Sequence, residues 1–105
     1  MGDKNTLIQF GHKFQTKIIS SLLGDKVFLQ TICDILEPEY FDSEANKWIS
    51  QTIRDYFFEY KTAPTLEVMK VKIDELENEI LQVAVVNDLK ESWRLIQSTD
   101  LKFVQ

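Results

Sequence analysis

The sequence predicts an all-α protein, a compact bundle of about five to six short helices. Apolar residues recur three and four positions apart over most of the chain, as they do along one face of a helix. Glycine and proline are scarce, at three and two of 105 residues, which disfavours the many turns of a β-sandwich. An apolar fraction of 44% suits a single domain with one hydrophobic core.

Two helices are expected in the first third of the chain. The first covers residues 11–23, and Gly24 behind it has the position of a left-handed C-terminal cap. Asp25 is a suitable N-cap for the second helix. The wide apolar stripe of this second helix indicates burial on more than one side, and Pro38 is expected to end it.

A turn and a third helix follow. The side chains of Tyr40 and Phe41 in the turn are expected to pack into the hydrophobic core. Ser43 is the expected N-cap of a helix from Glu44 to Tyr60, in which apolar residues at four-residue spacing form one face. Phe58 lies off that face, so packing of this face in the core does not account for an aromatic residue at this position.

The last third is helical in pattern and contains one expected break. Thr65 is the predicted cap of a fourth helix. Its apolar residues resemble a coiled-coil seam, but the pattern lasts under three heptads, which favours an amphipathic helix packed within the domain. One helix over residues 65–98 would reach roughly 50 Å, too long for this domain, so a break is expected at residues 78–82. The fifth helix would then carry Val85, Val86, Leu89, Trp93 and Ile96.

The chain therefore divides into three stretches. Residues 1–10 are predicted to form a polar leader or arm, and residues 11–98 a globular helical domain. Residues 98–100, Ser-Thr-Asp, have the composition of a turn with a fresh N-cap. Residues 99–105 are accordingly predicted to start a helical hairpin that is truncated at Gln105.

The sequence contains no recognisable catalytic motif. A phosphate-binding P-loop needs closely spaced glycines before a Lys-Ser/Thr pair, and none of the three glycines stands near such a pair. One cysteine and one histidine, Cys33 and His12, are too few for zinc. Cys33 lies within an apolar helical pattern, where a buried thiol is unreactive, and His12 is expected to be solvated. The acidic run from Asp74 to Glu79 is interpreted as a solvated helix surface. We therefore expect no enzyme, no cofactor and no metal in this chain.

The net charge and the apolar pattern favour other proteins as the partners of this chain. The net charge of −5 disfavours direct nucleic-acid binding, which depends on lysine and arginine at phosphates. No apolar run is long enough to span a membrane. The four aromatic residues from Tyr56 to Tyr60 cannot all fit on one buried helix face. They are interpreted either as core residues or as part of a protein interface. The candidate protein-interface residues are Tyr56, Phe58, Trp93, Leu101 and Phe103.

Four segments, in this order and spacing, carry a resemblance to a known family. They are IISSLLGD at residues 18–25, LEPEYF at 36–41, SEANKWI at 43–49 and YKTAPTL at 60–66. In these segments the chain resembles the N-terminal domain of DnaB-type replicative DNA helicases, and it looks most like the T-even-type bacteriophage members. The resemblance covers about half of the chain, and beyond Leu66 it is mostly one of helical pattern.

The resemblance implies a function through the parent protein. The parent would be a ring-shaped hexamer that unwinds DNA at a replication fork, using ATP and Mg²⁺ in a separate motor domain missing here. N-terminal domains of this family form a collar that helps close the ring and docks primase or a helicase loader. The cytoplasm of a bacterium or phage-infected host is the implied location. Because the hairpin that pairs neighbouring subunits is almost wholly absent, the fragment is expected to be a monomer or weak dimer.

Two other interpretations remain open at this point. A free-standing helical adaptor unrelated to replication would have the same fold and the same lack of a motor. A small helical enzyme using a pair of carboxylates would need a polar pocket, which the apolar pattern does not predict.

Overall fold

The computed structural model describes residues 11–104, with the backbone alone for His12 and for residues 97–104. Within that range the chain forms five α-helices, one 3-10 helix and no strand, so the prediction of an all-α bundle is confirmed. The radius of gyration over Cα atoms is 13.4 Å, near the ~13 Å of a compact 100-residue domain. The leader predicted for residues 1–10 lies outside the described residues.

Helix α2 (Gly11–Gly24) has nearly the predicted bounds, but it ends differently. Gly24 is the last helical residue and has no positive φ angle, so the predicted left-handed cap is wrong. A Cβ atom on Gly24 would lie 3.4 Å from Cγ1 of Ile96. A side chain at this position would make ordinary van der Waals contact with Ile96 of α6, and the extended backbone of Asp25 redirects the chain.

Helix α3 (Lys26–Ile32) begins as predicted and ends early. The Asp25 carboxylate accepts a hydrogen bond from the backbone N–H of Phe28 at 3.1 Å, which confirms the N-cap. The prediction that the helix continues to Pro38 is wrong, because Cys33 already begins a turn.

The segment that contains α3 and the following turn buries one side only. Leu29, Cys33 and Leu36 are buried, whereas Val27 and Ile35 are 70% and 67% exposed. Burial on more than one side was the wrong expectation.

The turn after α3 is a 3-10 helix, η2 (Pro38–Tyr40). Phe41 is fully buried, and Tyr40 is partly buried against the core. The prediction that both side chains pack inward is therefore confirmed. The side-chain oxygen of Gln15 in α2 accepts a hydrogen bond from the backbone N–H of Asp42 at 3.1 Å. This bond joins the turn to the first helix.

Helix α4 (Glu44–Tyr60) has the predicted bounds. The Ser43 hydroxyl accepts a hydrogen bond from the N–H of Asn46 at 3.0 Å, which confirms the cap. Lys61 ends the helix in the left-handed conformation, with φ 63°, and its N–H donates to the Phe57 carbonyl at 2.7 Å. This conformation is one that glycine normally provides.

Helix α5 (Leu66–Asp74) begins at the predicted cap. The Thr65 hydroxyl accepts a hydrogen bond from the N–H of Val68 at 3.2 Å. Met69 and Ile73 are buried in the domain core, in agreement with the preferred amphipathic reading. The apolar repeat does not continue as a seam, because the helix ends at Asp74.

Helix α6 (Glu79–Val104) follows a break at residues 75–78, slightly earlier than predicted. Asn78 determines this position, since its side-chain oxygen accepts a hydrogen bond from the N–H of Leu81 at 3.0 Å. The turn expected at residues 98–100 is wrong, because α6 runs through it. Ser, Thr and Asp each cost a helix only a few tenths of a kcal/mol, and without Gly or Pro a long helix propagates through them.

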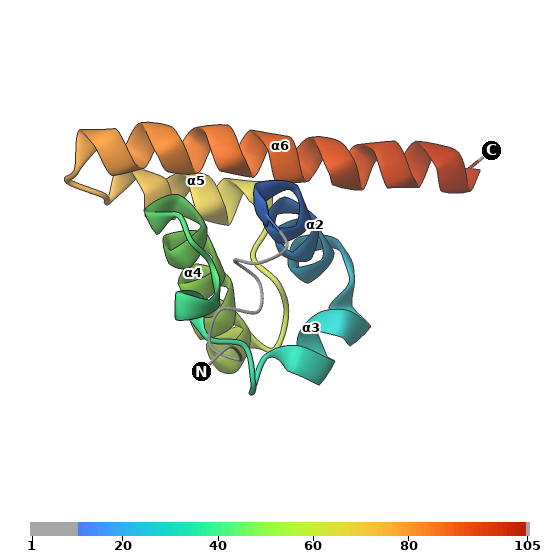
Figure 1. The fold of residues 1–105 in the computed structure, drawn as a ribbon. Coiled ribbons are helices and arrows are strands. Elements are labelled where there is room, and N and C mark those ends of the chain that lie inside the picture. The colour runs from blue at the N-terminus through green and yellow to red at the C-terminus, as the bar shows by residue number, and fades with distance from the viewer. Residues whose placement is uncertain (1–10, 105) are drawn as a thin grey trace.

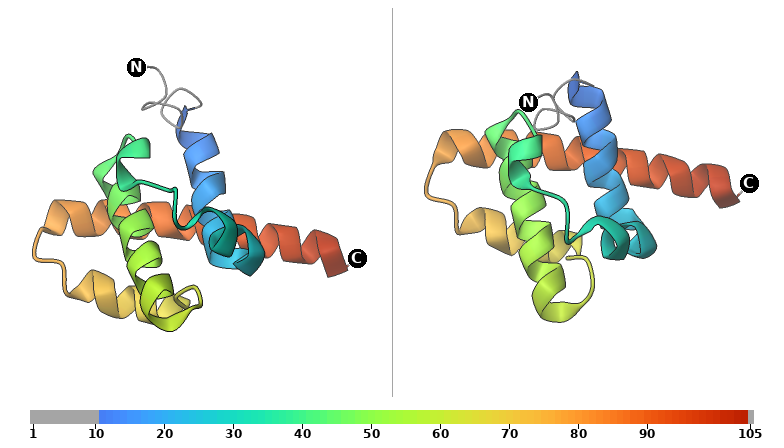
Figure 2. Two further views of the ribbon diagram at one scale, coloured as in Figure 1. Left: turned by 90° about the horizontal axis from the view of Figure 1, so that it is seen from below. Right: turned by 60° about the horizontal axis from the view of Figure 1, so that its bottom comes forward.

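The helices are arranged around α6, as Figures 1 and 2 show. Helices α2 and α4 lie side by side across α6, and α5 folds back along its N-terminal part. The C-terminal part of α6 projects beyond the other helices (Figure 1). The core lies where α2, α4 and α6 meet, and its buried apolar residues include Ile19, Leu22, Ile49, Ile53, Val85 and Leu89.

Lys61 gives a test of the α4–α5 connection. Among residues 11–104 it is the non-glycine residue with a positive φ, 63°. We expect Lys61→Gly to be more stable than Lys61→Ala by about 1 kcal/mol in urea unfolding, because only glycine adopts this conformation without steric cost. Both variants lose the hydrogen bond from the lysine Nζ to the Phe58 carbonyl, so their difference isolates the backbone. Equal stabilities would contradict the left-handed cap.

Candidate functional site

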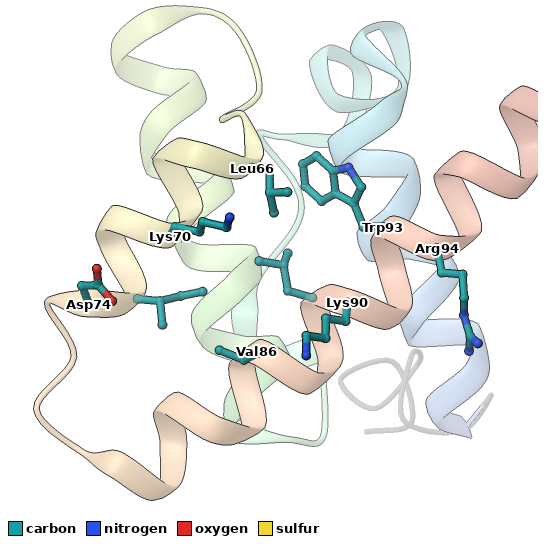
Figure 3. Close-up of a pocket in the computed structure, with 9 residues that line it drawn as sticks. Leu66, Lys70, Asp74, Val86, Lys90, Trp93 and Arg94 are labelled. Atoms are coloured by element: carbon teal, nitrogen blue, oxygen red, sulfur yellow. The ribbon is translucent and has the colours of Figure 1, made fainter.

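An apolar groove lies between α5 and α6 (Figure 3). Its volume is about 610 Å³. The indole ring of Trp93 points from α6 toward Leu66 of α5. The apolar residues that line the groove are Leu66 and Ile73 from α5 and Val86, Leu89 and Trp93 from α6.

Local bonds hold the two walls of the groove in place. The caps Thr65 and Asn78 determine where each helix starts. The side-chain amide of Gln82 donates a hydrogen bond to the Ile73 carbonyl at 2.9 Å, which ties the first turn of α6 to the end of α5. The α5–α6 hairpin is therefore braced at its closed end.

Charged side chains stand at the rim. Lys70 and Lys90 are exposed on opposite walls, and neither has an ion pair within the described residues. Arg94 is different, because its guanidinium lies 2.6 Å from the Glu91 carboxylate and points away from α5 in Figure 3. Hydrogen bonding to Glu91 raises the pKa of Arg94. The unpaired charges at the centre of the rim, those of Lys70 and Lys90, are therefore positive. Asp74 adds a negative charge at the end of the groove near the α5–α6 loop.

The groove continues along the hairpin. A second hollow of about 320 Å³ shares Ile73, Asp74 and Val86 with the first, and it extends to Val83. Val83 is 61% exposed. The apolar surface of the groove thus extends along α6 from Trp93 to Val83. Ile80 is 84% exposed, but it lines a different hollow with Ser43 and Ala45 at the start of α4.

The predicted aromatic residues of α4 lie elsewhere. Tyr56 and Tyr60 stack with ring centroids 4.4 Å apart, and both line a smaller hollow between α4 and α5 with Trp48. Lys72 of α5 lines this hollow between α4 and α5, on a different side of α5 from Lys70. Tyr56 and Trp93 therefore belong to separate surfaces.

Phe58 lies on neither of these surfaces. It is 43% exposed, and the guanidinium carbon of Arg54 lies 5.5 Å from its ring centroid. Arg54 also forms an ion pair with Glu37 at 3.6 Å. Phe58 thus packs against a charged residue at the surface, while its neighbour Phe57 is only 9% exposed and belongs to the core.

The five candidate interface residues are therefore not one site. The side chains of Leu101 and Phe103 lie outside the described residues, although their backbone continues α6. Sequence reasoning identified Trp93 but missed Lys70 and Lys90. A signal was present, because each lysine follows an apolar wall residue by four positions, Leu66 and Val86, and so shares its helix face.

Among the described residues, no group of three or more His, Cys, Asp or Glu side chains could hold a metal ion. Cys33 is buried, as predicted, and burial raises the pKa of its thiol, with a further increase from the Asp34 carboxylate. No helix of the described residues is long and apolar enough to cross a membrane.

The fold and the groove define an all-α protein with an apolar, partly cationic groove between two of its helices. No family model, no curated protein and no solved structure matches the chain.

Phe57 and Phe58 are a matched pair for separating core from surface. We expect Phe57→Ala to lower the free energy of unfolding by about 3–5 kcal/mol, as truncation of a core phenylalanine does. Phe58→Ala should cost only about 1 kcal/mol, mostly its contact with Arg54. Chemical denaturation measures both, and a loss at Phe58 as large as that at Phe57 would make it a core residue.

The buried thiol gives a second test. We expect Cys33 to react with a disulfide reagent at pH 8 about an order of magnitude or more slowly than in the guanidinium-unfolded chain, since a raised pKa leaves less thiolate and attack requires local opening. Release of the chromophore follows the reaction. The same rate in both states would contradict the burial.

Proposed function

We propose that the chain is the non-catalytic N-terminal collar domain of a hexameric DnaB-type replicative DNA helicase. In this role it helps to assemble the ring and docks primase or a helicase loader during DNA replication. ATP hydrolysis with Mg²⁺ would belong to a separate motor domain. The chain itself supplies helical surface for other proteins.

The observation that carries the proposal is the position of the four resembling segments in the fold. Asp25 lies at the α2–α3 joint, Pro38 begins the 3-10 turn, Ser43 caps α4 and Thr65 caps α5. Joints determine how successive helices are directed, because caps and prolines restrict the backbone there. The resembling residues thus stand where this chain changes direction between helices, which supports the proposal.

Two further features support the proposal. The C-terminal part of α6 projects from the bundle (Figure 1), as a helix leading to a subunit-pairing hairpin would. The net charge of −5 favours protein partners over DNA. Both features agree with a domain that acts by docking.

The test uses the complete reading frame that contains this chain. We expect the purified product to form a hexamer by native mass spectrometry and to unwind a forked duplex when ATP is present. Removal of residues 1–105 should lower ring assembly and the binding of primase or loader, while DNA-stimulated ATP hydrolysis by the remaining protein persists.

The free-standing adaptor predicts a different result. A reading frame whose product has no ATP-dependent unwinding and forms no ring overturns the helicase proposal. A hexamer that binds primase equally well without residues 1–105 also overturns the docking role.

A further inference from the structure

The α5–α6 groove combines an apolar floor with two lysines that have no ion pair among the side chains that the structure describes. We propose that this groove binds an acidic amphipathic helix of a partner protein. Apolar side chains of that helix contact Trp93 and Leu66, and its carboxylates meet Lys70 and Lys90. The inference rests on the docking role proposed above and adds the chemistry of the docked segment.

The dimensions of the groove fit a helix. Its walls and its continuation extend along α6 from Val83 to Trp93, ten residues or about 15 Å. Apolar anchors at i, i+4 and i+7 of a docked helix span about 10 Å. Three such anchors can therefore contact the groove together. The closed end at Gln82 and the indole of Trp93 limit the bound segment to roughly three turns.

Charge identifies the occupant as acidic. The chain carries −5 overall, so an acidic partner is repelled by most of its surface and attracted where unpaired lysines gather. Lys70 and Lys90 stand on opposite walls of the groove, so a carboxylate on each side of a docked helix can pair with one lysine. Two unpaired lysines are few for a nucleic-acid strand, whose binding neutralises several phosphates.

The direct test is peptide binding to the 105-residue chain. The probe is a synthetic fluorescent helical peptide with leucine at i, i+4 and i+7 and glutamate beside these positions. A counterpart has lysine at every glutamate. We expect the glutamate peptide to bind, as fluorescence anisotropy measures, and the lysine peptide to bind more weakly by about tenfold or more, because it is repelled by both rim lysines.

Charge reversal tests the assigned residues. Lys70→Glu/Lys90→Glu should weaken binding of the glutamate peptide by about tenfold and improve binding of the lysine peptide. The matched control is Lys26→Glu/Lys72→Glu, which has the same net charge, exposed positions and one change on α5. This control should keep the affinity close to that of the unchanged chain. Circular dichroism verifies that both variants fold.

An optical signal locates the peptide. With Trp48→Phe, Trp93 is the remaining tryptophan of the chain, and its emission should shift to shorter wavelength when a peptide covers it. Equal binding of both peptides, equal binding by the two double variants, or no response of Trp93 overturns the inference. Tighter binding of a single-stranded oligonucleotide than of the glutamate peptide overturns it as well. None of these results alters ring assembly or unwinding, so the two proposals fail separately.

Discussion

The packing of three helices against α6 is the interaction on which the rest of the structure depends. Val85 and Leu89 of α6 are buried, and α2, α4 and α5 all contact this helix. Burial of each such side chain contributes about 1.5–3 kcal/mol. Helices of seven and nine residues, the lengths of α3 and α5, are marginal alone in water. They persist because α6 and the core formed on it supply a surface to pack against.

The same packing creates the groove. Helix α5 is much shorter than α6 and covers only part of its flank, so apolar side chains remain accessible between them. The hydrogen bond from the Gln82 side-chain amide to the Ile73 carbonyl fixes the spacing of α5 and α6 at the end of the hairpin near the loop. The groove runs along the whole of α5, and two helix caps and one hydrogen bond hold its walls in place.

Sequence reasoning succeeded wherever the determining interactions are local. The bounds of α4 and the caps Asp25, Ser43 and Thr65 follow from side chains that bond to a backbone N–H three residues away. It failed at Gly24, which ends α2 without the left-handed conformation, and at residues 98–100, where single weak helix formers do not stop a long helix. The candidate site was found only through Trp93, since its other members are ordinary lysines and aliphatic residues.

The sequence by itself determined the all-α class, the start of most helices and the burial of Cys33, because periodicity and capping act within one helical turn. Tertiary structure alone decided that Val27, Ile35 and Ile80 stay exposed, and that Lys70 and Lys90 face one groove. An apolar stripe indicates that a helix has a face to bury, but not how much of that face a neighbour will cover. That extent depends on the lengths and positions of helices distant in sequence, which no local pattern encodes.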